Sequence, residues 1–168
     1  AFGGKKVIDN ITLSIRKNES IAFVGESGSG KTTLVNIISG LLKPAHGSYH
    51  IDGKELKDIN INQFQKRVGF IAQEPVIFST SIFNNITFFA EKTEETKARF
   101  WKAINDSALK DFMTNFNNNE NEDLGSNGVN ISGGQRQRIA IARELYRDID
   151  ILILDEATAA LDGETERM

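Results

Sequence analysis

The sequence has no cysteine, two prolines, two histidines and one tryptophan. The lack of cysteine excludes disulfide scaffolds and thiolate metal sites, and it permits a reducing compartment. No apolar run approaches the roughly 20 residues that span a bilayer as a helix, and the first residues do not form a signal-peptide pattern. We therefore expect this chain by itself to be soluble.

Neither sign of charge dominates the chain. The 20 basic and 23 acidic residues are mixed along it and give a formal net charge of −3. Such a sequence has no extended basic field for nucleic acid or an anionic membrane surface, so we expect no nucleic-acid partner. With 168 residues, of which 39% are hydrophobic, the chain is long enough for one sizeable α/β core, and a second full domain is not expected.

The stretch from Gly25 to Thr32 fits the phosphate-binding pattern G-x-x-x-x-G-K-[ST]. Its glycines allow backbone conformations that turn successive N–H groups toward a phosphate. The Lys31 ammonium adds positive charge, and the Thr32 hydroxyl suits a Mg²⁺ ion that bridges the phosphates. A glycine-rich turn can match this pattern by chance. The strand expected at residues 21–24 and the helix expected at residues 33–42 supply the strand–loop–helix context that this P-loop motif requires.

The sequence around this loop predicts β-structure. Apolar patterns predict strands at residues 7–8 and 11–15, and a short strand at residues 48–53 that ends in an Asp-Gly turn. Phe2 is the only aromatic residue before the strand that leads into the loop. Its ring could stack on a purine base, and an ordinary core or edge position explains it equally well.

Polar side chains follow two further apolar runs. Gln73 comes after residues 68–72 and Asp155 after residues 151–154, and we expect both runs to be parallel strands. A polar residue that leaves the carboxyl end of such a strand can reach a ligand at the sheet edge. Gln73 is a candidate ligand for a metal or the attacking water, Asp155 suits the Mg²⁺ shell, and Glu156 suits polarisation of the attacking water. A solvated glutamine and carboxylates that cap a turn are the alternatives.

Between these two runs the pattern is mainly helical. Apolar residues recur at spacings near three and four from Thr93 to about Asn115, and a polar loop is expected at residues 115–123. Another helix is expected after Ser132. Ser132 and the two glycines that follow it either form a second anion-binding helix end or contain a simple N-cap.

Taken in order, these motifs resemble the ATP-binding cassette (ABC) ATPases. The P-loop is followed by a glutamine after a strand, by Ser-Gly-Gly-Gln at residues 132–135, by an apolar run that ends in Asp-Glu, and by Ala-Leu-Asp at residues 160–162. The resemblance covers nearly the whole chain, and the Ser-Gly-Gly-Gln sequence in this position is highly specific to that superfamily. It implies ATP and Mg²⁺ as cofactors.

The resemblance also implies a role for each matching position. Residues 25–33 correspond to the Walker A loop, Gln73 to the Q-loop glutamine, residues 132–135 to the signature, Asp155 to the Walker B aspartate, Glu156 to the catalytic base and Asp162 to the D-loop aspartate. The implied catalytic residues are Glu156 and Gln73, and the implied Mg²⁺ ligands are Thr32, Gln73 and Asp155. The implied nucleotide contacts are Phe2, Gly25, Ser27, Gly28, Ser29, Gly30, Lys31, Thr32, Thr33, Ser132, Gly133, Gly134, Gln135 and Asp162.

The fold implied by the resemblance is α/β. It is a P-loop NTPase (RecA-like) core with a mixed or parallel sheet, an N-terminal antiparallel β subdomain and an inserted α-helical subdomain. The chain would then be a single nucleotide-binding domain. About residues 1–75 and 145–168 would form the core and β subdomain, and about residues 76–144 the mainly helical subdomain.

In this family two cassettes form a head-to-tail dimer, here expected to be a homodimer, with ATP between one Walker A loop and the partner's Ser132-Gly133-Gly134. Residues 73–86 and 122–128 resemble exporter-type cassettes. That similarity implies transmembrane domains in the same full-length polypeptide and a place at the cytoplasmic face of the membrane. An importer ATPase subunit is one alternative. A soluble ABC ATPase of the DNA-repair type is another. Such proteins carry long coiled-coil or lever insertions, between the Q-loop and the signature or far downstream, and the absence of a sustained heptad pattern between Gln73 and Ser132 disfavours this alternative.

The family pattern continues past the D-loop to a further core strand and a switch histidine. The sequence ends at Met168 without them, and its two histidines, His46 and His50, lie far upstream. We therefore expect a fragment of a longer polypeptide, which binds Mg·ATP weakly and has little turnover.

Overall fold

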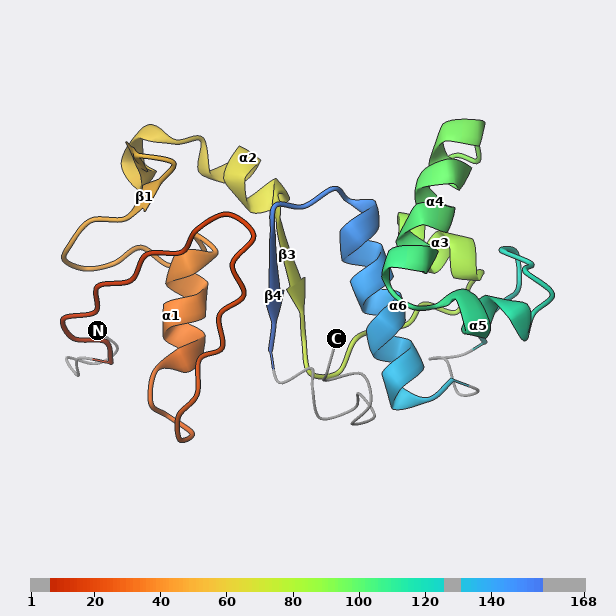
Figure 1. The fold of residues 1–168 in the computed structure, drawn as a ribbon, viewed down its shortest axis with the longest axis horizontal. Helices are drawn as coiled ribbons and strands as arrows, with labels where there is room; N and C mark the ends of the chain where they lie inside the picture. Colours follow the sequence, from red (N-terminus) through yellow and green to blue (C-terminus); the bar gives the residue numbers. More distant parts are fainter. Residues whose placement is uncertain (1–6, 126–130, 156–168) are drawn as a thin grey trace. The chain divides into compact units, whose positions relative to one another are not determined.

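The computed structural model describes residues 7–125 and 131–155, and the chain divides into two compact units, Ala1–Lys66 and Arg67–Met168. In the first unit, residues 7–30 form turns and irregular structure up to the first helix (Figure 1). The elements of this unit are α1 (Lys31–Ile38), β1 (His50–Ile51), β2 (Lys54–Glu55), a 3₁₀ turn η1 (Leu56–Asp58) and α2 (Ile61–Lys66).

The Asp-Gly turn predicted from the sequence is confirmed. β1 and β2 pair antiparallel, with His50 opposite Glu55. Asp52 and Gly53 between them have φ values of 49° and 78°, and a tight hairpin turn of this handedness needs positive φ at both central residues. The strand is His50–Ile51, shorter than the predicted residues 48–53, of which the last two form the turn.

The strands predicted at residues 7–8, 11–15 and 21–24 are wrong. A strand needs a neighbour that accepts and donates its backbone hydrogen bonds, and β1–β2 is the pairing found among the described residues of this unit. Apolar side chains in these stretches remain exposed, among them Ile11 at 53% and Val24 at 94%. These stretches therefore have an apolar pattern typical of strands, but no neighbouring strand among the described residues pairs with them.

The helix predicted after the loop is confirmed, although it begins two residues earlier than residue 33 and ends at Ile38. Gly40 follows its end with φ 73°, and a Cβ on Gly40 would lie 2.7 Å from the Ile61 Cδ1 atom. Two side chains hold this end: the Tyr49 hydroxyl donates to the Ile38 carbonyl at 2.6 Å, and the Gln65 amide donates to the Gly40 carbonyl at 3.0 Å. The end of α1 is thus fixed against α2.

Gly40→Ala is expected to destabilise the chain more than Gly53→Ala. Both glycines have positive φ, so alanine is strained at either position by about 1–2 kcal/mol. Only at Gly40 would the new methyl group meet neighbours, and overpacking of this kind adds about 1–3 kcal/mol. Urea unfolding followed by circular dichroism checks the difference. Equal midpoints for the two variants would show that α2 does not pack against the end of α1.

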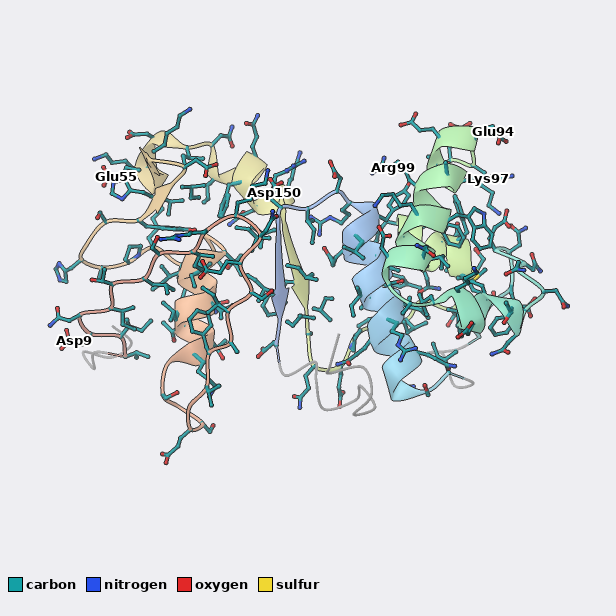
Figure 2. All side chains as sticks on the ribbon, in the orientation of Figure 1. Asp9, Glu55, Glu94, Lys97, Arg99 and Asp150 are labelled. Carbon is teal, nitrogen blue, oxygen red and sulfur yellow. The ribbon has the colours of Figure 1, made fainter. Side chains whose placement is uncertain are left out.

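The described part of the second unit begins and ends with strands that pair with each other in parallel. β3 (Val68–Ile71) and β4 (Ile151–Leu154) pair in register from Val68 opposite Ile151 to Ile71 opposite Leu154, which confirms both predicted strands. At the start of the pair, Arg67 forms an ion pair with Asp150 at 2.7 Å; Figure 2 labels this aspartate. The hydrogen bond and charge of Asp150 raise the pKa of Arg67.

Between these strands in the sequence, the described residues form four helices. They are α3 (Ile82–Thr87), α4 (Glu94–Asp106), α5 (Lys110–Thr114) and α6 (Gly133–Tyr146). α6 packs against β3 on one side and against α3 and α4 on the other, so it forms the layer between the strands and the other helices (Figure 1). The predicted division near residues 75 and 144 into core and helical subdomain stays a prediction.

The helical stretch predicted from Thr93 to Asn115 is two helices. α4 begins at a capping box, in which the Thr93 hydroxyl accepts from the Thr96 amide at 3.2 Å and the Thr93 amide donates to the Thr96 hydroxyl at 2.9 Å. It ends at Asp106 with Ser107 as the C-cap, and Ala108 then adopts a left-handed conformation with φ 54°. The polar segment after α5 forms turns, as predicted.

The hydrophobic core of the second unit lies among its helices. Phe83 of α3 and Phe100 of α4 are fully buried with ring centroids 5.3 Å apart. The apolar periodicity of α4 and α5 is therefore core packing, as the sequence indicated. No helix in residues 7–125 and 131–155 is long and apolar enough to cross a bilayer. The fully or nearly fully buried apolar residues of this core include Ile82, Phe83, Ile86, Phe100, Ile104, Leu109, Met113 and Ile139.

Candidate functional site

The P-loop has the backbone that its glycines predict. Gly28 and Gly30 have φ values of 80° and 98°, a backbone conformation that residues other than glycine rarely adopt. Gly30 is the N-cap of α1, and a Cβ there would lie 3.1 Å from the Val7 carbonyl oxygen. Because glycine caps this helix without a side-chain hydrogen bond, the first N–H groups of α1 remain available to an anion.

Lys31 reaches back over the loop. Its ammonium nitrogen donates to the Gly25 carbonyl at 2.7 Å and to the Glu26 carbonyl at 2.9 Å. The Ser29 amide closes the same turn by donating to the Glu26 carbonyl at 3.2 Å. The ammonium group is thus held over the P-loop backbone, beside the helix end whose partial charge is also positive.

The remaining P-loop side chains are accessible to a ligand. Ser27, Ser29 and Thr32 are exposed, and Thr33 is half-buried in the first turn of α1. The exposed Thr32 hydroxyl is an oxygen donor of the kind that Mg²⁺ prefers. These positions therefore have the accessibility that the predicted contacts need.

Gln73 and Asp155 follow the carboxyl ends of the two parallel strands. The Asp155 amide donates to the Ile71 carbonyl at 3.0 Å, which continues the pairing one residue beyond β4. Gln73 lies two residues after Ile71 and is exposed. Both candidate ligands predicted from the strand ends therefore follow the same end of the strand pair. Within the described part of the chain, no three His, Cys, Asp or Glu residues cluster as a metal site.

Ser132 caps the N-terminus of α6. Its hydroxyl accepts from the Gln135 amide at 3.2 Å, and its own amide donates to the Gln135 side-chain oxygen at 2.8 Å. The N-cap interpretation is therefore confirmed. It does not compete with anion binding, since the capped amide belongs to Gln135 and Gly133 and Gly134 add no side chain over the helix end. Phe2, Glu156 and Asp162 lie outside the described residues.

The sequence of this chain matches a known protein family over most of its length. The profile of the ABC transporter family matches residues 8–159, which is most of the chain. The chain belongs to the ABC transporter family. Its fold is accordingly the P-loop NTPase fold of an ABC ATPase domain, with the antiparallel and parallel strand pairs described above.

Curated relatives of this ABC domain include exporters. It is 41% identical to the ATP-dependent lipid A-core flippase of Ralstonia nicotianae over 165 residues, which are 98% of this chain and 28% of the flippase. The flippase of Neisseria meningitidis is 39% identical over 98% of this chain and 26% of its own length. ABC transporter B family member 2 of Dictyostelium discoideum is 38% identical over 96% of this chain and 11% of its own length. The ABC domain therefore spans about a quarter or less of these relatives.

A solved structure supports the same relationship. The structure of a bacterial Atm1-family ABC exporter with ATP bound has a TM-score of 0.69 and 31% sequence identity to this ABC domain. The similarity covers 84% of this chain and 25% of that exporter. The exporter-type resemblance seen in the sequence thus extends to the fold.

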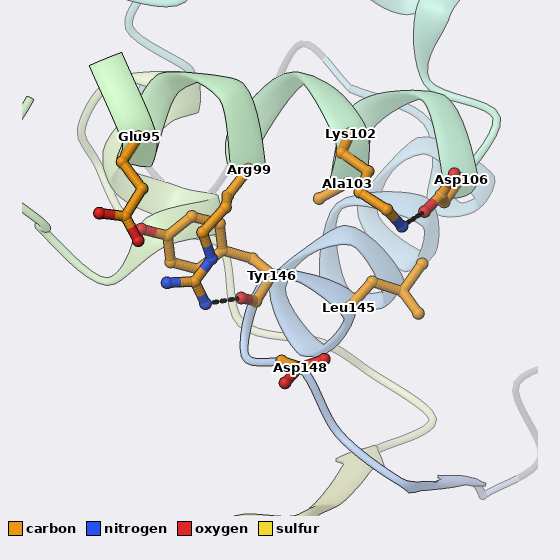
Figure 3. Close-up of a pocket in the computed structure, with 8 residues that line it drawn as sticks. All are labelled: Glu95, Arg99, Lys102, Ala103, Asp106, Leu145, Tyr146 and Asp148. Atoms are coloured by element: carbon orange, nitrogen blue, oxygen red, sulfur yellow. Dashed lines mark hydrogen bonds and ion pairs between the residues drawn. The ribbon is translucent and has the colours of Figure 1, made fainter. Parts of the chain in front are cut away.

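The ABC domain also has a cavity that none of the motifs predicts. It has a volume of about 350 Å³ and lies between α4 and the C-terminal end of α6, the opposite end from Ser132 (Figure 3). Arg99 points across it and donates to the Tyr146 carbonyl at 2.7 Å. None of its lining residues belongs to the predicted nucleotide site. They are Glu95, Arg99, Lys102, Ala103, Asp106, Leu145, Tyr146 and Asp148.

Sequence reasoning missed two polar residues in the core of this ABC domain. Asn85 is 0% exposed and Arg143 is 7% exposed. Burial lowers the pKa of Arg143, and it raises the pKa of its neighbour Glu144. A signal was present, because each of the two interrupts an apolar helical run at a position that faces the core.

Proposed function

We propose that this chain is the nucleotide-binding cassette of an exporter-type ABC transporter, which binds and hydrolyses ATP to drive transport across a membrane. The observation that carries the proposal is the P-loop geometry within a chain that the ABC transporter profile matches over residues 8–159. Its positive-φ glycines, its helix start without a side-chain cap and the Lys31 ammonium together form a cradle for phosphate.

The loop residues would bind the phosphates. The amide groups at the start of α1 donate to phosphate oxygens, and Lys31 exchanges its two carbonyl partners for the negatively charged oxygens. Phosphate oxygens are stronger acceptors than neutral carbonyls, so this exchange favours the bound state. Phe2 is proposed to stack on the base.

The metal and the attacking water belong to a second group of residues. Thr32, Gln73 and Asp155 would hold Mg²⁺ through oxygen atoms, and the ion neutralises charge on the phosphates when it is bound. The hydrogen bond from the Asp155 amide to the Ile71 carbonyl fixes the main chain of Asp155, from which its carboxylate extends. Glu156 follows directly and would polarise the attacking water as the general base.

A second copy of the cassette would complete the site. We propose a head-to-tail homodimer in which Ser132, Gly133 and Gly134 of one copy face the phosphates bound by the other. Their helix start offers N–H groups and a partial positive charge to the nucleotide, and Gln135 holds the cap in shape. Asp162 would contact the other copy beside this helix end.

The transmembrane domains would dock near the segment that follows Gln73. Three large apolar side chains there are exposed: Val76 at 63%, Phe88 at 48% and Phe89 at 60%. A group of exposed apolar side chains of this kind marks an interaction surface. We propose that these domains belong to the same full-length polypeptide, which places the cassette at the cytoplasmic face of the membrane. The transported substrate would contact those domains and not the cassette.

Nucleotide titration of the 168-residue chain tests this function. A fluorescent ATP analogue with Mg²⁺ is expected to bind saturably to one site per chain, to be displaced by unlabelled ATP and to bind more weakly when Mg²⁺ is chelated. Turnover by the isolated chain is expected to be slow, because the signature of a second copy is needed. No saturable binding at millimolar Mg·ATP would overturn the proposal.

A further inference from the structure

The segment at residues 76–81, which follows Gln73, is irregular but tightly held. The Asn85 side chain, fully buried in α3, makes four hydrogen bonds to its backbone. The Asn85 amide nitrogen donates to the carbonyls of Phe78, Thr80 and Ser81 at 3.0, 3.2 and 3.1 Å, and its oxygen accepts from the Phe78 amide at 2.8 Å. One side chain thus determines the path of this segment.

Arg143 ties the same segment to α6. Both terminal nitrogens of its guanidinium group donate to the Val76 carbonyl at 3.1 Å, and its Nε donates to the Asn85 carbonyl at 2.7 Å. The group also lies over the rings of Phe78 and Phe88, at 5.1 and 5.2 Å from their centroids. Since its main partners are backbone oxygens, a shift of the main chain at Val76 or Asn85 would move the Arg143 side chain with it.

These contacts connect two parts of the proposed site. Val76 lies three residues after Gln73, and Arg143 lies on the helix that Ser132 caps. The two ends of this connection on α6 are separated by about 16 Å along the helix, at about 1.5 Å per residue. A helix of this length transmits a displacement at one end to the other, because its hydrogen-bonded backbone moves as a rigid body.

We propose that Arg143 is a positioning residue that links Gln73 to the signature serine. When Mg·ATP draws the Gln73 segment toward the metal, the guanidinium group carries α6 with it and changes the position of Ser132. This inference rests on the proposed function, since it assumes that Gln73 responds to bound Mg·ATP. The planar guanidinium suits the role, because a lysine ammonium cannot make the same set of fixed bonds.

Hydrogen–deuterium exchange of the 168-residue chain tests the link, at a concentration at which light scattering shows a monomer. In the parent chain, Mg·ATP is expected to slow exchange at residues 25–33 and to change exchange at residues 131–137. Arg143→Lys is expected to keep the slowed exchange at residues 25–33 and to lose the change at residues 131–137. Arg147→Lys is the matched control, because Arg147 pairs with Glu144 at the end of the same helix, and both effects should remain.

Unchanged protection of α4 in the variant shows that its core is folded. Should Arg143→Lys fail to fold, Phe88→Ala replaces it, since this change removes a ring contact of Arg143 and leaves the hydrogen bonds, and it should reduce the response at residues 131–137. A full response at residues 131–137 in the folded variant would overturn the inference, as would protection at residues 25–33 without any response in the parent chain. Failure of Mg·ATP to protect residues 25–33 in the parent chain would instead refute the proposed function, and the inference with it.

Discussion

Lys31→Ala is expected to weaken Mg·ATP binding by on the order of 100-fold or more, since charge-assisted hydrogen bonds contribute about 1.5–3 kcal/mol each and about 1.4 kcal/mol corresponds to a factor of ten. In the absence of nucleotide the ammonium group already donates two such bonds, to the carbonyls of Gly25 and Glu26. When nucleotide binds, the ammonium group exchanges these carbonyl bonds for bonds to phosphate oxygens, which alanine cannot make. Titration with the fluorescent ATP analogue measures the loss.

The matched control for this variant is Lys43→Ala. Lys43 is an exposed lysine of the same unit that lies outside the P-loop, and its removal changes the net charge equally. Binding to this control should remain at the parent level. If both variants bound ATP as well as the parent chain, the phosphates would not lie at the P-loop, and the assignment of residues 25–33 would be wrong.

Glu156→Gln is expected to reduce ATP hydrolysis by about 10²- to 10⁴-fold, the usual contribution of a general acid or base. The substitution keeps the shape of the side chain but removes the carboxylate that would accept a proton from the attacking water. ATP binding should be retained, because the P-loop is unaltered. The measurement is phosphate release by the transporter polypeptide that we propose contains this cassette.

Glu91→Gln provides the comparison for that experiment. Glu91 is an exposed carboxylate that precedes α4, away from every motif of the site, so its loss should leave hydrolysis unchanged. Hydrolysis at the parent rate by Glu156→Gln would identify another group as the base. The neighbouring Asp155 would then be the first alternative to examine.

Local signals in the sequence were sufficient for much of the fold. The hairpin turn at Asp52-Gly53 and the caps at Thr93 and Ser132 depend on residues within four positions of one another, and the structure contains all three. The parallel strands were predictable because their apolar runs are short and end in polar residues. The strands expected before the P-loop failed, since an apolar pattern says nothing about whether a partner strand is present.

The candidate site shows the same division. The P-loop conformation follows from Gly28 and Gly30, whose positive φ values could be expected from the motif alone. The network of Arg143 could not, because its partners Val76 and Asn85 lie 67 and 58 residues away in the sequence. Only the fold decides which carbonyl groups a buried guanidinium will reach.

The central claim is that this cassette holds half of a site that a second copy completes, and a complementation experiment tests it most directly. Two differently tagged copies are mixed in the Glu156→Gln background, one with Lys31→Ala and the other with Ser132→Arg, and ATP-dependent association is measured by pull-down. Each variant alone should fail to associate. The mixture should regain association, because one intact P-loop then faces one intact Ser132. Association of the unmixed Glu156→Gln parent with no recovery in the mixture would contradict the head-to-tail arrangement.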